Sequence, residues 1–571
     1  MHTGDSPIKS WLPHPLERLL NYYAPADPSY HRIPTDKSRD NTAHRRGLSK
    51  SMVYGVLLGA LVIGGAGSGW YFNQRTGRGE FPSLYEADIE TVTKGLECND
   101  YTSVDLVKAS CWHSTPSPNS LLNAAKQTYI ARINEVNDLL RPVIEANSDA
   151  LDIATALDHE RSKGMVRGPM HGIPILIKDT IATKDKMNNT AGSYALVGAK
   201  APSDSTIAKK LREAGAIILG KTNPSEWGSF RIPWDSSNGW SAYGGQTYGA
   251  FYPHQDPSGS SSGSAVAASE RMDTIGPLTK TVKDSAYVLQ SIVGTDVYDN
   301  YTSTIPDNVD KDFVGACELT ALRGARLGVP RNVINLMWDN TTASTVAAFN
   351  NTLDILRSSG ATILETDFPA AQAFLNDTLL ALQIMSADFV VNIESYLKQL
   401  THNPHNISTL LELRAWTRQS PLESYPGKST SVWDFALENW NNTTPEFWQA
   451  YQKGLYYDTE GGLLGTIKRH GLDAVVLPSK FSWYFAAVAG APVVSIPMGV
   501  MGDEQPVVVD PDGLVGSAPG IPFGFSFLGE KWSDARIVGL AYAMEQRTRV
   551  RGKVKPVVRP WTELGDVVGR R

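Results

Sequence analysis

The sequence predicts an α/β protein in which helices cover a mixed, largely parallel central sheet within a single large domain. Three observations support this prediction. First, from about residue 80 onward, short apolar runs alternate with segments of helical periodicity. Second, neither an internal repeat nor a long linker interrupts these segments. Third, a unit of helix, glycine and strand occurs twice. An apolar segment before residue 80 predicts one transmembrane helix in addition.

Spacing and termination signals predict the individual elements. The apolar run 172–177 is expected to form a buried strand. Residues 204–214 begin with a capping aspartate and end at Gly215, and the strand 216–219 follows; the same unit recurs at 345–363. The other expected elements are helices at 121–147, 148–163 and 533–548 and strands at 474–477, 493–496 and 523–527.

Composition excludes several classes of protein. The 53 basic and 59 acidic side chains give a formal charge of −6, which does not match the basic surface of a nucleic-acid-binding protein. An apolar fraction of 42% excludes wholesale disorder. The three cysteines (Cys98, Cys111 and Cys317) are too few for a disulfide framework and lack zinc-ligand spacing. We therefore expect neither a metal site nor a nucleic-acid partner.

The N-terminal region predicts a membrane anchor. Residues 1–51 are polar and lack periodicity, which indicates a disordered tail, and residues 52–72 form an uncharged stretch long enough to span a bilayer. A buried or secretory-signal segment is the alternative, although cleavable signals normally lie at the extreme N-terminus. Basic residues before the span place the tail in the cytoplasm and the domain 80–571 in the lumen or outside the cell (Lys37, Arg39, Arg45, Arg46 and Lys50).

Eight Asn-x-Ser/Thr sequons after the predicted span favour a secretory glycoprotein. They begin at Asn188, Asn300, Asn340, Asn350, Asn376, Asn406, Asn441 and Asn442.

A run of serines and glycines at 256–269 is the most unusual local sequence. Such a loop, opening a helix, leaves backbone N–H groups free to bind an anion or an oxyanion, and a flexible Gly/Ser loop is the alternative. Residues 259–263 also fit G-x-S-x-G with Ser261 at the centre. We disfavour a nucleophile elbow because turn residues, not a strand, precede it.

Lys178 directly follows the predicted buried strand. A lysine drawn into an apolar site has a lowered pKa and can accept a proton from a serine, whereas a lysine at a strand mouth simply faces solvent. The serine-rich loop favours the first interpretation, because it supplies hydroxyl groups for such a base.

Several motifs in the correct order make the chain similar to the amidase signature family of Ser-cisSer-Lys hydrolases, and most similar to fungal amidases. The resemblance covers about residues 81–550 and rests on the segments 168–179, 211–223, 259–265, 276–284 and 520–529. It implies the α/β fold of that family, a small-molecule amide substrate, and neither a metal nor an organic cofactor.

The resemblance also implies roles for individual residues. Lys178 corresponds to the base, and Ser260 to the bridging serine that a cis peptide holds. Gly259 and Ser261 belong to the loop that orients the substrate. In such a mechanism, neutral Lys178 accepts a proton through Ser260 from a nucleophilic serine, and backbone N–H groups stabilise the oxyanion.

The chain departs from the family pattern at two places. The segment that carries the nucleophilic serine is missing, because a deletion near 269–272 joins the serine loop almost directly to the 276–284 motif. Ser264, Ser269 and Ser285 lie nearby, but none has the Gly-rich surroundings that would expose a nucleophile. Residues 109–127 form an atypical insertion between two halves of an expected helix.

We therefore hypothesise errors of exon assignment at both places, with a natural inactive splice form as the alternative. Transcripts that match this chain at both junctions would contradict the hypothesis of exon-assignment errors. The predicted function is that of an amidase acting on the carbon–nitrogen bond of a carboxylic amide, inactive in this chain. The alternative is a membrane-anchored, non-catalytic pseudoenzyme or binding protein on the same scaffold.

Overall fold

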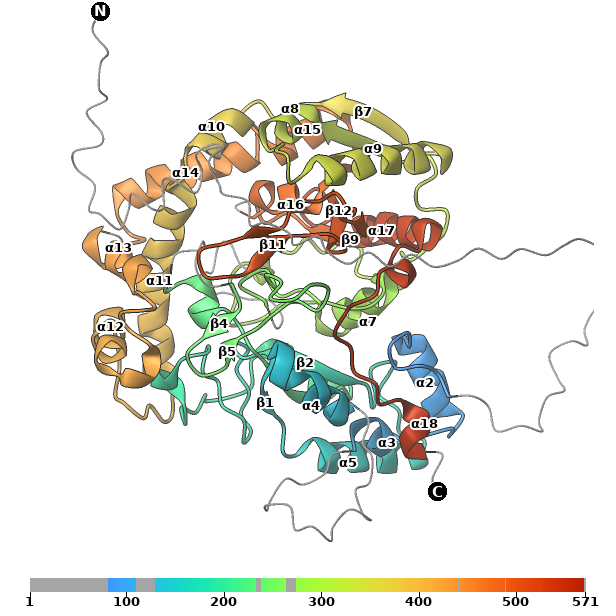
Figure 1. Cartoon of the computed structure of the whole chain (residues 1–571), viewed down its shortest axis with the longest axis vertical. Helices are drawn as coiled ribbons and strands as arrows, with labels where there is room; N and C mark the ends of the chain where they lie inside the picture. Colours follow the sequence, from blue (N-terminus) through green and yellow to red (C-terminus); the bar gives the residue numbers. More distant parts are fainter. Residues whose placement is uncertain are drawn as a thin grey trace, which may run out of the picture. The chain divides into compact units, whose positions relative to one another are not determined.

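The computed structural model describes residues 81–108, 129–232, 238–262, 274–439, 441–487 and 489–568 (Figure 1). From Pro82 onward, these residues belong to one compact unit. Four predictions concern residues outside the described ranges: the tail 1–51, the apolar segment 52–72, the insertion 109–127 and the deletion near 269–272. They stay predictions.

The membrane prediction requires a correction. Among the described residues, no helix combines the length and the apolar character that a bilayer span requires. The helix α11 (Leu380–Gln399) has 20 residues, but Asp388, Glu394 and Lys398 interrupt its apolar surface. The predicted localisation, a single-pass membrane protein with a cytoplasmic N-terminus and a lumenal or extracellular domain, is contradicted by this finding.

The larger sheet has five strands in the order β7-β6-β8-β12-β9. β6 pairs in parallel with β7 and β8, and β12 pairs antiparallel with β8 and β9. α9 (Ala343–Ser358) and α17 (Asp534–Thr548) contact this sheet and bury its apolar side chains in the main core. The strands are β6 (Arg326–Pro330), β7 (Thr362–Thr366), β8 (Ala474–Pro478), β9 (Val493–Val500) and β12 (Pro522–Leu528).

The smaller sheet positions the candidate site. In it, β3 (Ile217–Thr222) lies between β1 (Val143–Ala146), which is antiparallel, and β2 (Pro174–Lys178), which is parallel. α5 (Ala150–Ser162) packs on β3 through a small apolar cluster that includes Leu157 and Leu219. β2 and β3 run in the same direction, so the residues after both strands lie at one edge of the sheet.

The mixed α/β prediction is confirmed, but the single, largely parallel sheet is not what the described strands form. They form two main sheets, with three parallel and three antiparallel pairings in total. β9 and β12 are joined by a loop with a short ribbon and need no crossover helix, and this makes their pairing antiparallel. The short ribbons are β4 (Trp240–Ser241) with β5 (Gly245–Gln246) and β10 (Val508–Val509) with β11 (Val515–Ser517).

One predicted helix ends earlier in the chain than expected. The helix predicted at 121–147 is described as α4 (Tyr129–Leu140), and its last residues instead form β1. Pro142 explains the break, because the residue before a proline avoids helical angles, and Arg141 adopts a φ of 47°. The remaining helices include α6 (Thr206–Glu213), which ends one residue short of the predicted bound.

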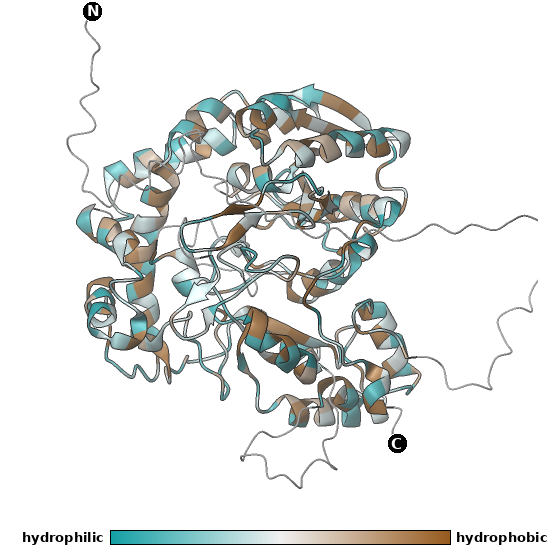
Figure 2. Ribbon diagram, viewed as in Figure 1, coloured by the Kyte–Doolittle hydropathy of each residue, from teal (hydrophilic) through white to brown (hydrophobic). Residues whose placement is uncertain are grey.

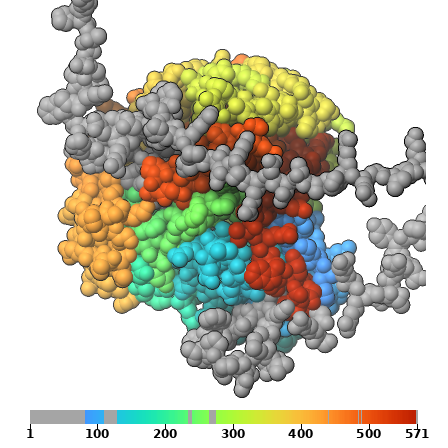
Figure 3. All heavy atoms as spheres, in the orientation of Figure 1, coloured from blue at the N-terminus to red at the C-terminus, as the bar shows by residue number. Residues whose placement is uncertain are grey.

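Figure 2 shows the apolar residues gathered on the strands and on the inward faces of the helices. On one side of the ribbon in Figure 1, α11 and its neighbours form a helical group around Trp433 and Phe389. In Figure 3 the C-terminal segment lies over the region of α3 and α4. The other described helices are α2 (Ile89–Glu97), α3 (Ser103–Val107), α7 (Val282–Ile292), α8 (Arg331–Leu336), α10 (Ala371–Asn376), α12 (Leu410–Gln419), α13 (Ser431–Asn439), α14 (Pro445–Asp458), α15 (Leu463–His470), α16 (Ser479–Ser482) and α18 (Leu564–Val568).

Candidate functional site

Lys178 and Ser260 are in direct contact although 82 positions separate them in the chain. Lys178 is the last residue of β2, its side chain is fully buried, and its Nζ donates a hydrogen bond to Ser260 Oγ at 3.1 Å. The apolar residues of β2 pair with β3 and hold the strand in the sheet. Lys178 is the first polar side chain after this apolar stretch, so pairing of the strand places it at the end of β2. The structure thus brings together two residues that the sequence singled out.

The loop that carries Ser260 approaches its neighbours closely. The peptide bond between Gly259 and Ser260 is cis. A Cβ at Gly259 would lie 2.2 Å from Asn238 Oδ1 and 3.0 Å from Ser225 Oγ, so only glycine fits there. Ser261 follows and is half-buried.

Ser225 supports this loop, and the sequence analysis missed it. Its backbone N–H donates to the carbonyl oxygen of Ser260 at 3.1 Å, and its Oγ accepts a hydrogen bond from the N–H of Gly239 at 2.9 Å. Asp256 holds the other side, since it accepts hydrogen bonds from Asn238 Nδ2 and from the N–H of Ser258. The signal for Ser225 was its place just after β3, at the same sheet edge as Lys178.

Asp179 and Lys221 form a buried polar cluster behind Lys178. Asp179 Oδ2 accepts hydrogen bonds from the N–H groups of Thr190 and Gly192, both at 3.2 Å, and Lys221 Nζ donates to Asn189 Oδ1 at 2.8 Å. Burial raises the pKa of Asp179 to about 6, against the opposing effect of the Lys221 charge. Burial likewise lowers the pKa of Lys221 to about 8.

The shifted pKa of Asp179 predicts a pH-dependent effect of Asp179→Asn. The native-state pKa of Asp179 lies above its ordinary value, so protonation favours the folded chain. That stability is present at low pH and is lost as the pH rises from about 4 through about 6. The amide does not titrate, and its oxygen still accepts the hydrogen bonds of Thr190 and Gly192. We expect the free energy of unfolding of the variant to rise relative to the parent by up to roughly 3 kcal/mol over this range.

Urea unfolding of both proteins at several pH values between 4 and 7 measures this difference. A difference that stays constant over the range would contradict the assignment to Asp179.

Three serines near the predicted deletion were considered as nucleophiles. Ser285 lies in the first turn of α7, and its hydroxyl forms a hydrogen bond with that of Thr279 at 2.6 Å rather than with Ser260. Ser264 and Ser269 fall outside the described residues. Within the described part of the chain, Lys178 is the hydrogen-bond partner of the Ser260 hydroxyl, and no group of three His, Cys, Asp or Glu side chains there is arranged to hold a metal ion.

Known proteins similar to this chain decide its family. A family profile described as Amidase matches residues 124–271 and 266–538. A putative amidase of Arthroderma benhamiae is 44% identical over 537 residues, which cover 86% of this chain and 90% of the relative. The chain belongs to the amidase family.

Further members of this amidase family are similar over most of their length. A putative amidase of Schizosaccharomyces pombe is 29% identical over 546 residues, covering 83% of this chain and 87% of its own. The structure of the native peptide amidase from Stenotrophomonas maltophilia aligns with a TM-score of 0.70 and 27% identity, covering 84% of this chain and 100% of that chain. The amidase signature fold and the resemblance to fungal amidases are thus confirmed.

The contact between Lys178 and Ser260 is of the kind that a proton relay requires. A buried amine lies within hydrogen-bond distance of one hydroxyl, and the loop that carries this hydroxyl also carries further backbone N–H groups. A relay of this kind needs a nucleophile on the far side of Ser260. No described side chain other than Lys178 hydrogen-bonds to the Ser260 hydroxyl.

Proposed function

We propose that Lys178 and Ser260 are the proton relay of an amidase that hydrolyses the carbon–nitrogen bond of a carboxylic amide, and that this chain does not complete the reaction. The observation that carries the proposal is the 3.1 Å contact between the buried lysine and the serine hydroxyl. Membership of an amidase family supports amides as the substrate class.

In the proposed mechanism, neutral Lys178 draws a proton from Ser260, which in turn deprotonates a nucleophilic serine. The nucleophile attacks the amide carbonyl and forms an acyl-enzyme, while backbone N–H groups of the Gly259–Ser261 loop and its surroundings stabilise the oxyanion. The relay then returns the proton to the leaving nitrogen, which must be protonated for the bond to break at a useful rate. Water finally releases the acid.

Two observations support the absence of the nucleophile. The family profile matches in two parts that meet at 266–271, which coincides with the predicted deletion near 269–272. Of the three serines considered as nucleophiles, Ser285 is the one within the described residues, and its hydroxyl is engaged with Thr279. We therefore propose that the relay has no nucleophile from which to take a proton.

A serine-directed fluorophosphonate probe tests the proposed inactivity. We expect this polypeptide neither to react with the probe nor to hydrolyse amides, although an unrelated serine hydrolase in the same mixture is labelled. Lys178→Ala is the diagnostic variant, and Lys163→Ala, which removes an exposed lysine, is its matched control. Labelling that Lys178→Ala abolishes and Lys163→Ala preserves would show that an active nucleophile exists in this chain.

A non-catalytic binding protein on the amidase scaffold is the second candidate function. The observation that favours it is a cavity of about 690 Å³ beside Asp179, which is large enough for a small organic ligand. Replacing residues 263–273 with the corresponding segment of the Arthroderma benhamiae relative separates the two candidates, because only the amidase relay would then hydrolyse amides.

A further inference from the structure

The sequence contains a single Asn-Gly dipeptide, Asn238–Gly239, and the fold places it against the loop that carries Ser260. Asn238 is half-buried and Gly239 is buried. The Nδ2 of Asn238 donates a hydrogen bond to Asp256 Oδ2 at 3.1 Å, and its Oδ1 lies so close to Gly259 that a Cβ there would come within 2.2 Å of it. Asn238 thus contacts the loop at two points.

The fold requires glycine at position 239. Gly239 has a φ of 76°, a left-handed backbone conformation that other residues rarely adopt, and an added Cβ would lie 2.6 Å from Pro257 Cγ. Its N–H donates to Ser225 Oγ at 2.9 Å, and its carbonyl oxygen accepts from the N–H of Thr247 at 2.9 Å. The contacts of this loop therefore account for both members of the dipeptide, the amide of Asn238 and the glycine that follows it.

An asparagine that precedes glycine loses its amide readily, because glycine has no side chain to hinder its own backbone nitrogen. That nitrogen bonds to the asparagine Cγ as its proton passes to water. The Cγ–Nδ2 bond breaks, and the leaving nitrogen takes up a proton and departs as ammonia. Water then opens the cyclic imide: breakage of the ring bond at Cγ yields aspartate, and breakage at the backbone carbonyl carbon yields isoaspartate. The chain and water are the only reactants.

We propose that Asn238 is a site of this deamidation and that the modification disconnects the loop that carries Ser260. The product has no Nδ2–H to donate to Asp256 and places a second carboxylate beside it, so an attraction becomes a repulsion. Burial already raises the pKa of Asp256, because its carboxylate is poorly solvated, and a second negative charge there is correspondingly unfavourable. Isoaspartate in addition lengthens the main chain by one carbon directly before Gly239.

The native contacts of the dipeptide slow the reaction while the loop is intact. The carbonyl oxygen of Asn238 accepts a hydrogen bond from Gln246 Nε2 at 2.7 Å, and its amide is held by Asp256. Attack requires the Gly239 nitrogen to leave Ser225 Oγ and the Asn238 side chain to turn toward it. Deamidation therefore follows loosening of the loop, and afterwards the original contacts cannot form again.

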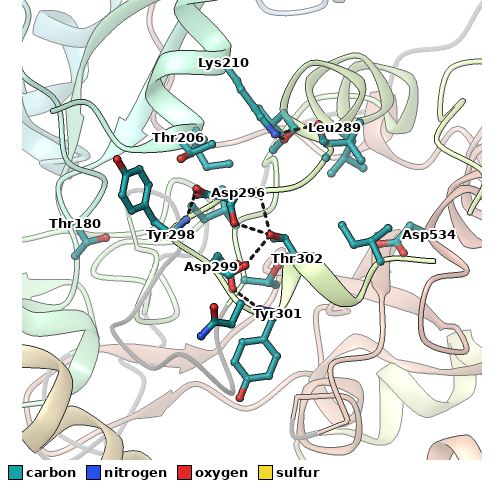
Figure 4. A pocket seen from close by; sticks show the side chains of 18 of the residues that line it. Thr180, Thr206, Lys210, Leu289, Asp296, Tyr298, Asp299, Tyr301, Thr302 and Asp534 are labelled. Atoms are coloured by element: carbon teal, nitrogen blue, oxygen red, sulfur yellow. Dashed lines mark hydrogen bonds between the residues drawn. The ribbon is translucent and has the colours of Figure 1, made fainter. Parts of the chain in front are cut away.

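The modification is an irreversible switch on the support of Ser260. It needs neither a nucleophilic serine nor an amide substrate, so it goes beyond the proposed function and does not depend on it. It is also separate from the cavity beside Asp179, part of whose wall is shown in Figure 4, because neither Asn238 nor Asp256 lines that cavity.

Peptide mapping of the folded full chain by mass spectrometry, after incubation at mildly alkaline pH, tests the site. We expect Asn238 to be converted to aspartate and isoaspartate before any other asparagine of the chain. Asp256→Ala removes the acceptor that holds the amide and should raise the rate at Asn238 at least about tenfold, the effect of one hydrogen bond to a charged group. Asp354→Ala, at a 75% exposed carboxylate of α9, should leave the rate unchanged.

Circular dichroism shows whether the Asp256→Ala chain is folded, and the parent unfolded in urea gives the rate without native contacts. If Asp256→Ala does not fold, Ser225→Ala takes its place, because it removes the acceptor of the Gly239 N–H. A folded variant that deamidates no faster than the parent, or conversion of another asparagine ahead of Asn238, would overturn the proposal.

Hydrogen–deuterium exchange of Asn238→Asp, one product of the reaction, tests the consequence for the loop. The N–H of Ser258 donates to Asp256 Oδ1 at 2.8 Å, so its exchange reports whether the loop keeps its support. We expect peptides covering 256–262 to exchange about tenfold faster in Asn238→Asp than in the parent. Asn351→Asp, at an exposed asparagine of α9, should match the parent. Unchanged exchange in Asn238→Asp would reject the proposed disconnection.

Discussion

Replacing residues 263–273 with the corresponding segment of the Arthroderma benhamiae relative should turn this chain, which we propose to be inactive, into an active amidase. The relative is 44% identical, so the surroundings of the segment are similar in the two proteins. On the proposed mechanism, this segment would supply the nucleophile from which Ser260 takes a proton. We expect amide hydrolysis at least about 10⁶-fold above the uncatalysed rate, measured as release of acid and amine.

Two controls connect this activity to the relay. In the replaced chain, Lys178→Ala should lower kcat by about 10²–10⁴-fold, the usual contribution of a positioned base, whereas Lys163→Ala should not change it. Circular dichroism before and after replacement would show that both chains are folded. If the replaced chain remained inactive while folded, or kept its rate after Lys178→Ala, the proposed mechanism would be wrong.

The second large effect is expected from Arg231→Met. Arg231 is fully buried between two carboxylates that are also buried, those of Glu226 and Glu423, and its Nη1 donates to Glu423 Oε2 at 2.7 Å. Its Nη2 donates to the carbonyl oxygens of Glu423 and Lys428 at 2.6 and 3.1 Å. Removing one partner of a buried ion pair costs about 3–5 kcal/mol because the remaining charge is left uncompensated.

The free energy of unfolding in urea measures this loss. Burial and the neighbouring Glu423 already raise the pKa of Glu226 well above its ordinary value, so removal of Arg231 should make the folded chain less stable as the pH rises. Arg357→Met is the control, because its pair with Asp354 at 2.7 Å is solvent-exposed and should cost less than about 1 kcal/mol. An equal decrease in the free energy of unfolding in the two variants would show that the buried ion pairs of Arg231 stabilise the fold no more than an exposed pair does.

The parts of the site that lie next to strand ends were predictable from the sequence. Lys178 follows an apolar run, and a run of that kind pairs within a sheet and ends at a defined edge. The serine loop was recognisable from its composition, and the motif order placed it near the lysine. The α/β class was also predictable, because helices and strands differ in the spacing of their apolar residues and the two spacings alternate along the chain.

Long-range polar pairing was not predictable. Arg231 and Glu423 are 192 positions apart, and nothing in either local sequence indicates the other. Lys221 was not predictable for the same reason. Its local sequence indicates only a residue of a buried strand, and its contacts with Asn189 and Asp179 depend on the fold. The division of the strands into two sheets also depends on which strands pair, and single-sequence periodicity does not contain that information.

The C-terminal segment that lies over α4 has a consequence for how the chain is made. Glu135 of α4 accepts a hydrogen bond from the N–H of Trp561 at 2.8 Å, and the buried Arg132 donates to the carbonyl of Thr562, 430 positions later. At usual translation rates, α4 leaves the ribosome roughly 20 to 90 s before these partners exist. During synthesis, Arg132 and Glu135 of α4 therefore lack these hydrogen-bond partners until the last residues of the domain have been made.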